Sequence, residues 1–493
     1  MKNQILFWAS AGILFLITRL FNLLIIPIFT DEAIYTYWAQ IALHDPANRF
    51  ISLVDGKQPL FIWIAAIFQK FINDPLLASR LVSAFAGFGS FVGIYLVAKT
   101  LFSDKVGKIT ALLYIILPFT LLYDRLAIFD SLLTMLGIYS VFFTIQLAKE
   151  PRLDLAILTG TSIGLATLTK SSGVFFLYLL PFSALLFNFS DKKFRITLAK
   201  WIVMAGVVFF ISQIIYNALR LSPLFYIIAR KNLEFIRPVS EVIKDPVLFF
   251  SQNFKSIFHW LNEYLGLPLV LIFLFAFIFG IVKKNYRILY LSTLILAPFL
   301  AECLFNKVLY PRFMLFYFPY VIILIAFAVK QILDFAKDKK RYVFVLLLLF
   351  IASPTLTSFK LLTSPQEAKI ADADAGQYLN GWPSGYGVKE VVNFLKQESK
   401  DQQVLVGTEG TFGLLPYAIQ IYFFADKNIQ LSGFWPVNEN NLPAQVLDSA
   451  KTKKTYFVFN ENQKEIENPR LKLIAKYQKG IGNSFMRLYE VVP

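Results

Sequence analysis

Two neighbouring carboxylates and a lysine share the first long polar segment of the sequence. Asp31 and Glu32 follow the first apolar run, and Lys57 lies further along in a Gly-Lys-Gln-Pro turn. Partial desolvation at the edge of an apolar run raises the proton affinity of a carboxylate, which suits a general base. A fixed ammonium group stabilises a phosphate that gains negative charge as it departs. These residues therefore predict a group transfer in which a proton is taken up and a phosphate is released.

The same residues also have plain structural interpretations, which the sequence alone leaves open. Thr30 and Asp31 are residue types that cap a helix. A lysine beside an aromatic run, as Lys57 is, often extends from a membrane surface to reach water.

A second acidic group stands between two apolar runs, in the sequence Asp-Arg-Leu-Ala-Ile-Phe-Asp at residues 124–130. As a turn, it would bring two carboxylates and a guanidinium to the membrane boundary. As part of a helix, it would place Asp130 inside a span, where an ionisable residue is costly and usually functional. We expect Asp31, Glu32 and Asp130 to be the catalytic residues.

Five cations are predicted to bind substrate on the same side of the membrane. Arg19, within the first apolar run, is expected near mid-membrane, where it needs a partner or a water-filled cavity. Several cations that converge on one face indicate a pocket for phosphate or pyrophosphate. The predicted substrate-binding residues are Lys57, Arg80, Arg125, Lys170 and Arg312.

The sequence offers few metal ligands. The two histidines, His44 and His259, stand at unrelated positions, and His259 is interpreted as an interfacial residue rather than a ligand. Cys303 is the only cysteine, so no internal disulfide forms. We predict no metal-binding residue, and a divalent metal cofactor is left open.

The elements that position these residues are membrane helices. Of the 493 residues, 57% are hydrophobic and only 16% are charged, which indicates a polytopic membrane protein. The net charge of +16 comes from basic residues between apolar runs, which argues against nucleic-acid binding. A span needs about 20 apolar residues, and about eleven are predicted on that rule. They lie near residues 5–29, 78–100, 107–123, 126–147, 153–169, 172–189, 198–219, 264–282, 287–305, 310–332 and 341–361.

The charges of the loops predict the orientation. With the amino terminus inside the cell, every inside loop is basic, as the positive-inside rule requires. The candidate site residues and the carboxyl-terminal region then lie on the outer face of the cell membrane. Two stretches of the first outer loop, Glu32–Leu43 and Pro59–Ile72, have apolar residues at helical spacing and are predicted to be interfacial helices.

The composition becomes polar after about residue 362, which predicts a membrane module at residues 1–361 and a small extracytoplasmic α/β domain at residues 362–493. Val388, Val391, Val392 and Leu395 form the apolar stripe of a helix. Residues 403–408, 455–460 and 485–492 are predicted strands.

With these residues in place, the chain resembles the membrane glycosyltransferases of the GT-C superfamily. The resemblance is particularly to bacterial relatives of the protein O-mannosyltransferases and of the aminoarabinose transferase that acts on lipid A. The resemblance covers residues 1 to about 360. Its motifs are Thr-Asp-Glu-Ala at 30–33, Gly-Lys-Gln-Pro-Leu-Phe-Ile-Trp at 56–63, Arg-Leu-Ala-Ile-Phe-Asp at 125–130, Leu-Thr-Lys at 168–170 and Tyr-Pro-Arg-Phe at 310–313.

The resemblance implies an inverting transfer of a sugar from a polyprenyl-phosphate carrier, of the dolichyl or undecaprenyl type, to an acceptor hydroxyl on the outer face. Asp31 matches the base of the family, Lys57 the lysine that holds the carrier phosphate, and Asp130 the second acidic position. The implied acceptor is a lipid, a polysaccharide or a protein. Gly56 stands where the aminoarabinose enzyme has a metal-binding acid, so that ligand is not carried over, and Gln58 replaces a common proline.

Two other classes of protein fit the sequence less well. A transporter or flippase of a lipid-linked sugar also needs apolar helices and phosphate-binding cations, but it requires polar groups along a path through the membrane. A non-catalytic receptor or assembly factor would act through its external domain alone.

Overall fold

The computed structural model describes residues 2–437, 440–464 and 467–493. The chain folds into two compact units. The helical unit comprises the residues up to Phe21 together with Phe50–Phe61 and Val82–Lys360. The sheet unit comprises Asn22–Arg49, Ile62–Leu81 and Leu361–Pro493. The predicted two-domain division at residues 361 and 362 stays a prediction.

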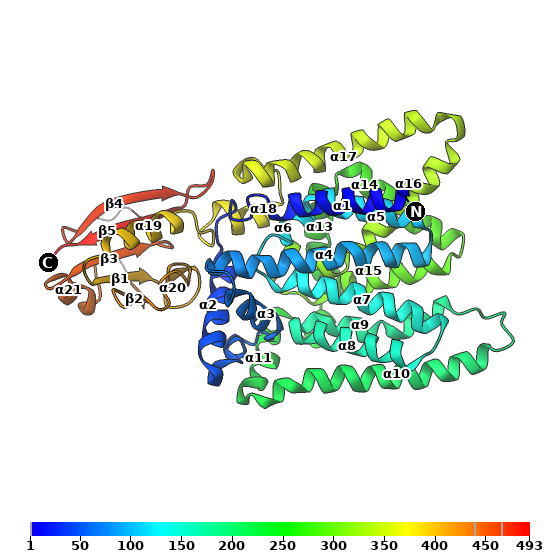
Figure 1. Ribbon diagram of the computed structural model, residues 1–493, viewed down its shortest axis with the longest axis horizontal. Coiled ribbons are helices and arrows are strands. Elements are labelled where there is room, and N and C mark those ends of the chain that lie inside the picture. Colours follow the sequence, from blue (N-terminus) through cyan, green and yellow to red (C-terminus); the bar gives the residue numbers. More distant parts are fainter. Residues whose placement is uncertain (1, 438–439, 465–466) are drawn as a thin grey trace. The chain divides into compact units, whose positions relative to one another are not determined.

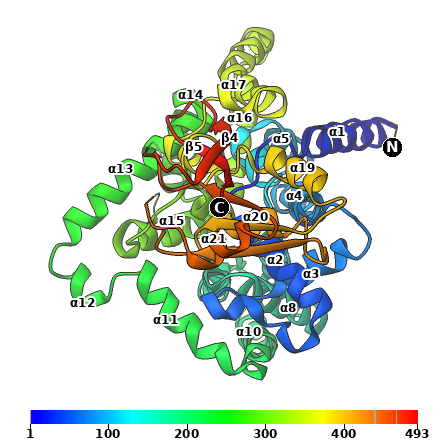
Figure 2. The ribbon, with the colours of Figure 1, turned by 90° about the vertical axis from the view of Figure 1, so that its left-hand side faces the viewer.

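The helical unit is built from helices that run alongside one another (Figure 1). Helix α8 packs against α7 and α10, and α16 packs against α5 and α14; Figure 2 shows α8 and α10 end on, side by side. Its α-helices are α1 (Lys2–Leu20), α5 (Asp104–Ile116), α6 (Pro118–Tyr123), α7 (Phe129–Lys149), α8 (Leu153–Thr169), α9 (Phe175–Tyr178), α10 (Phe194–Asn217), α11 (Tyr226–Phe235), α12 (Val239–Val242), α13 (Pro246–Leu265), α14 (Leu267–Val282), α15 (Tyr286–Phe305), α16 (Phe318–Phe335) and most of α17 (Lys340–Thr363). Helices α3 (Leu60–Gln69) and α4 (Pro75–Leu101) contribute residues to both units.

Six helices in the described part of the chain are long and apolar enough to cross a membrane. They are Pro75–Leu101, Phe129–Lys149, Phe194–Leu221, Tyr286–Phe305, Phe318–Phe335 and Lys337–Thr363. Helices α13 and α14 meet the same criterion as a pair that bends by 113°. The protein is thus a mostly helical, multi-pass membrane protein, and the predicted number of eleven spans is not confirmed.

The first span was predicted at residues 5–29, and this is wrong, because helix α1 ends at Leu20. Asn22 has a φ of 47°, outside the right-handed helical region. Arg125 explains the end of the helix: its Nη1 donates to the carbonyl oxygens of Thr18, Arg19 and Phe21 at 3.0, 3.1 and 2.8 Å. The last carbonyls of a helix lack partners within it, and this guanidinium supplies one.

Arg19 therefore lies in the last turn of α1 rather than at mid-span. Its Nε is 3.2 Å from Asp124 Oδ2, and both side chains are fully buried. Two further nitrogens of Arg19 donate to the carbonyl oxygens of Ile115 and Tyr114 at 2.6 and 2.9 Å. A buried charge needs a partner and full hydrogen bonding, and Arg19 has both. The pair holds α1 against the end of α5.

The helices predicted in the first outer loop are present, as α2 (Thr30–His44) and α3. Most of the α2 side chains are buried within the fold, including Ala33, Ile34 and Trp38. That both helices lie on a membrane surface stays a prediction.

The sheet unit contains one five-stranded sheet of order β2-β1-β3-β5-β4. Its strands are β1 (Val404–Glu409), β2 (Ile429–Phe434), β3 (Lys454–Phe459), β4 (Leu471–Gln478) and β5 (Phe485–Val491). Strands β2 and β3 run parallel to β1 on either side, whereas β5 is antiparallel to β3 and β4. Helices α19 (Val388–Glu398), α20 (Leu414–Gln420) and α21 (Ala444–Ala450) accompany the sheet, and α18 (Asp372–Ala375) precedes them.

The predicted helix and the three predicted strands of this region are confirmed as α19, β1, β3 and β5. Val388, Val391, Val392 and Leu395 are all buried in the core of the sheet unit. Strands β2 and β4, at the two edges of the sheet, were not predicted. In β4 only Leu471 is buried, so the apolar alternation by which a strand is predicted is absent.

Candidate active site

A connected group of polar residues lies in the helical unit, where several helices and turns meet. Gln58, next to Lys57, donates through Nε2 to Ser171 Oγ at 2.7 Å. The Ser171 hydroxyl in turn donates to Asn232 Oδ1 of α11 at 3.3 Å. Ser171 directly follows Lys170, so the contact joins the Gly-Lys-Gln-Pro turn to the end of α8. Two motifs that are more than a hundred residues apart in the sequence are thereby brought together.

Asp130 and Lys170 form the ion pair of this group. Lys170 Nζ is 2.6 Å from Asp130 Oδ1, and the exposed fractions of the two side chains are 26% and 6%. Residues 124–128 are not helical, and α7 begins at Phe129, so Asp130 stands in its first turn. Carboxylates are favoured in the first turn because the backbone N–H groups of a helix point there. Of the two readings of residues 124–130, the turn is the one observed.

An aromatic ring brings a second cation next to Lys170. Lys170 Nζ lies 4.6 Å from the ring centre of Phe313, and the guanidinium carbon of Arg312 lies 5.9 Å from the same ring. Arg312 also faces the Tyr310 ring at 5.4 Å. Cations are attracted to the faces of aromatic rings over such distances. Phe313 therefore helps to hold two positive charges near one another without neutralising either.

Lys57 is held in a comparable way. Its Nζ is 5.0 Å from the ring centre of Phe235 on α11. The preceding Gly56 has a φ of +66°, and a Cβ there would come within 2.8 Å of Lys231 Cβ. Glycine is thus required both for the backbone conformation and for the close approach of α11. Lys231 ties the same turn to α11, because its Nζ is 2.9 Å from Asp55 Oδ1.

Glu302 is a buried acid that sequence reasoning missed. It lies near the end of α15, is 7% exposed, and accepts a hydrogen bond from the Tyr317 hydroxyl at 2.7 Å. Lys170 is near enough to act on it electrostatically. The available signal was an acid inside the apolar run 287–305, since ionisable residues within spans are usually functional.

Of the eight predicted site residues, the helical unit brings together Lys57, Asp130, Lys170 and Arg312 through the contacts above. Arg125 lies in the same unit but contacts the end of α1. Its observed contacts are those of a helix cap.

The other three predicted residues belong to the sheet unit. Glu32 is fully buried and forms a two-pronged ion pair with Arg80, with Nε to Oε1 at 2.8 Å and Nη2 to Oε2 at 2.7 Å. Arg80 also donates to the carbonyl oxygens of Leu23, Ile26 and Pro27 at 2.8, 2.8 and 3.2 Å. Breaking a buried pair of this kind typically costs about 3–5 kcal/mol. The pair fixes the chain that leads into α2.

Asp31 differs from its neighbour Glu32, because it is partly exposed in the first turn of α2. Glu32 Oε2 accepts from the backbone N–H of Phe29 at 3.3 Å and so helps to start the helix. The two adjacent acids therefore have different environments: one is enclosed by an arginine, and the other reaches solvent.

A second polar cluster lies at the carboxyl ends of β1 and β3 in the sheet unit. Lys479 is buried and donates to the carbonyl oxygens of Trp382 and Ser384 at 2.8 and 2.6 Å and to the side-chain oxygen of Asn460. Burial lowers the pKa of Lys479 from its usual value of 10.5 to about 7, although Glu461 and Glu409 oppose the shift. Burial, with Glu409 nearby, raises the pKa of Glu461.

The lowered pKa of Lys479 predicts a pH-dependent stability of the sheet unit. Between pH 7 and pH 10.5 the unfolded chain binds a proton at Lys479 that the folded chain does not, so the contribution of Lys479 to stability rises with pH in this window and is constant below it. From pH 7 to pH 9 the gain is about 2 kcal/mol. Pulse proteolysis of the full-length protein, read on the fragment after residue 361, measures it.

The matched control is Lys479→Met, in which the absolute stability falls but this dependence on pH disappears. If stability rises equally with pH in the wild type and in the variant, the pH dependence comes from groups other than Lys479.

In the described ranges of the chain, no three His, Cys, Asp or Glu side chains are placed to hold a metal ion together.

Comparisons with known proteins agree with this architecture. Residues 56–216 match the family model described as dolichyl-phosphate-mannose-protein mannosyltransferase. The fold is similar to that of ArnT from Cupriavidus metallidurans, with a TM-score of 0.58, 13% identity and coverage of 99% of this chain and 98% of that chain. It is also similar to the Archaeoglobus fulgidus oligosaccharyltransferase, with a TM-score of 0.54, 12% identity and coverage of 92% of this chain and 69% of that chain. No curated protein sequence matches the chain significantly.

The family match contains Lys57, Asp130 and Lys170, three of the four predicted residues that the helical unit brings together. The family model matches residues 56–216, and the structural similarities show that the fold is shared with ArnT and with the archaeal oligosaccharyltransferase.

Proposed function

We propose that the protein transfers a sugar, a hexosyl or pentosyl group, from a polyprenyl-phosphate carrier to an acceptor hydroxyl on the outer face of the cell membrane, with inversion at the anomeric carbon. The observation that carries this proposal is the gathering of Lys57, Lys170 and Arg312 around one polar network in the helical unit. The three cations are partly exposed, and positive charge suits a phosphate better than a neutral ligand.

The structural relatives support a lipid-phosphate donor. One ArnT structure was determined with undecaprenyl phosphate bound, and it covers 99% of this chain at a TM-score of 0.57. An archaeal oligosaccharyltransferase of TM-score 0.54 was determined with an inhibitory peptide and a dolichol-phosphate. The phosphodiester that links the sugar to the carrier has one negative charge before transfer. The phosphate gains a second negative charge when it leaves with the carrier. Fixed cations therefore stabilise the transition state more than the bound donor.

The acceptor proton needs a separate group, and we assign it to Asp31. In the proposed step, the acceptor oxygen attacks the anomeric carbon from the face opposite the phosphate. The bond from the anomeric carbon to the phosphate oxygen breaks, and its electron pair leaves with polyprenyl phosphate. The acceptor proton moves to the Asp31 carboxylate, which is partly exposed and therefore accessible. The products are the glycoside and the free carrier phosphate.

The other predicted residues receive positioning roles. Asp130 holds the Lys170 ammonium at 2.6 Å and so fixes its direction. Glu32 and Arg80 hold the chain before α2, and thereby place Asp31 at the start of that helix. Arg125 completes the end of α1. Each acts on the reaction through another residue.

The membrane arrangement belongs to the same proposal. We propose eleven spans: the six long helices, helix α14, and four shorter segments at Gln4–Leu20, α5 with α6, Leu153–Thr169 and Ser171–Leu186. The basic loops support an orientation with the amino terminus inside and the residues after 361 outside.

The deciding experiment measures free polyprenyl phosphate released by the purified protein in lipid vesicles. The donors are a panel of polyprenyl-phosphate sugars, and a membrane extract supplies acceptors. Release with one donor, together with labelled sugar on an acceptor, supports the proposal and identifies the sugar. Transbilayer movement of labelled donor without any release would instead support a flippase.

A further inference from the structure

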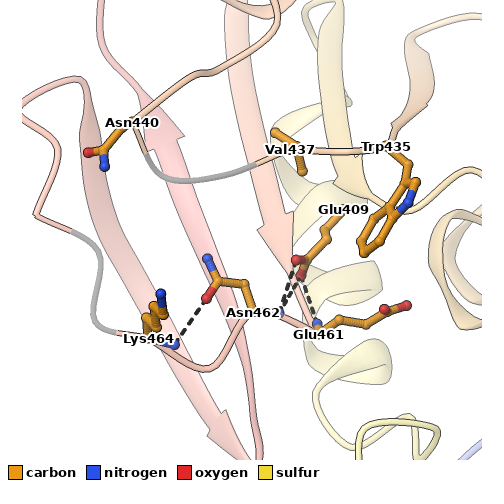
Figure 3. Close-up of a pocket in the computed structure, with 7 residues that line it drawn as sticks. All are labelled: Glu409, Trp435, Val437, Asn440, Glu461, Asn462 and Lys464. Atoms are coloured by element: carbon orange, nitrogen blue, oxygen red, sulfur yellow. Dashed lines mark hydrogen bonds between the residues drawn. The ribbon is translucent and has the colours of Figure 1, made fainter.

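The sheet unit has a pocket at the carboxyl ends of its parallel strands (Figure 3). Glu409 ends β1, Trp435 directly follows β2, and Glu461 and Asn462 follow β3. The cavity volume is about 500 Å³, within the range of about 300–1,000 Å³ that is usual for small-molecule sites. It is distinct from the polar network of the helical unit.

The place of the pocket in the sheet is the one where α/β proteins bind ligands. Strands β1 and β3 are parallel neighbours, and the chain leaves β1 towards β2 on one side but leaves β3 towards β4 and β5 on the other. Connections that part in opposite directions leave a crevice beyond the carboxyl ends of the two strands. The pocket lies at this switch point.

The base of the pocket is held in place before any ligand arrives. The Glu409 carboxylate accepts the backbone N–H groups of Asn460, Glu461 and Asn462 at 2.8, 2.7 and 3.0 Å. Lys479 also stabilises this loop, because its ammonium group donates to the side-chain oxygen of Asn460. This network uses Glu409 to fix the backbone after β3 rather than to bind a ligand. The side chains of Glu461 and Asn462 are therefore presented from a rigid loop.

Trp435 supplies the apolar surface. Its side chain is 59% exposed, although burial of an indole is strongly favourable. Figure 3 shows its ring and the Glu461 carboxylate on the same side of Glu409. Val437 adds a second apolar contact. An exposed aromatic face beside carboxylate and amide groups matches a ligand with one apolar face and several hydroxyl groups at its edge.

We propose that this pocket is a saccharide-binding site. A pyranose ring would place its C–H face on the Trp435 indole and its hydroxyl groups against Glu461 and Asn462. The pocket is lined by two carboxylates, those of Glu409 and Glu461, and by one lysine, Lys464. This excess of negative charge disfavours a phosphate or another anion. We assign the bound saccharide to the acceptor of the transfer reaction. Only this assignment, and not the saccharide site itself, rests on the proposed function.

The test is saturation-transfer NMR on the full-length protein in lipid nanodiscs, with mannotriose and chitotriose as probes. We expect transfer to the ring protons of at least one probe, and a loss of affinity of about tenfold or more in Trp435→Ala. Trp435→Phe, which keeps an aromatic face, should retain most of the binding.

The matched control is Trp382→Ala, because Trp382 is 47% exposed in the same unit but does not line the pocket. Binding should be unchanged in that variant and in Asp31→Asn, which separates this site from the transfer reaction. The proposal is overturned if neither probe binds the wild type, or if Trp435→Ala binds as the wild type does. Binding without any detectable transfer would contradict the proposed function and leave the saccharide site standing.

Discussion

Asp31→Asn is expected to abolish sugar transfer while the protein remains folded. The amide has the size and shape of the carboxylate but cannot accept the acceptor proton. Loss of a general base typically lowers a rate by about 10²–10⁴-fold. Asp31 is partly exposed in the first turn of α2, so its replacement removes no fully buried charge. The measurement is the release of polyprenyl phosphate by equal amounts of folded wild type and variant.

The neighbouring acid provides the control. Glu32→Gln removes the charge that the buried Arg80 guanidinium faces, so the variant should lose stability, by about 3–5 kcal/mol, rather than a catalytic step. Its transfer activity should fall in parallel with its thermal midpoint in detergent. Normal transfer by Asp31→Asn, or a folded but inactive Glu32→Gln, would move the role of the base away from Asp31.

This contrast shows what the sequence was able to predict. From the sequence, Asp31 and Glu32 were both predicted to be catalytic, because both are acidic and they are adjacent in the chain. What separates them is Arg80, which contacts Glu32 from another helix. Such a pairing has no local signature in the sequence, because any of several arginines is chemically able to pair with this carboxylate. Residue type and membrane side are readable from the sequence, whereas the choice of partner is a property of the fold.

The same limit explains the first helix. The apolar run continues to Phe29, so hydropathy predicts a span of that length. The helix ends at Leu20 because Arg125 binds the carbonyl oxygens at its end. In the sheet unit, by contrast, α19, β1, β3 and β5 were predicted because their own side chains form the core. Elements defined by burial are predictable, and elements that a distant side chain ends are not.

Lys57→Met is expected to lower kcat/KM for the lipid-linked donor by about 10²–10³-fold, as the loss of one group that stabilises a developing negative charge usually does. Methionine keeps the length of the side chain and its packing on the Phe235 ring, so the change removes mainly the charge. Lys57→Arg should recover part of the rate, because a cation remains. The measurement is the initial rate of carrier release over a range of donor concentrations.

Lys231→Met is the matched control. Lys231 lies beside the same turn, but its ammonium is 2.9 Å from Asp55 and 3.0 Å from Glu234, so its charge is already balanced. In this variant we therefore expect kcat/KM for the lipid-linked donor to change by only a few fold. If Lys57→Met lowers kcat with KM unchanged, the ammonium acts on the charge that develops as the carrier leaves. If only KM rises, the ammonium binds the donor phosphate equally before and during transfer. Equal rates in Lys57→Met and the wild type would remove Lys57 from the reaction, and Lys170 and Arg312 would then be the cations that hold the phosphate.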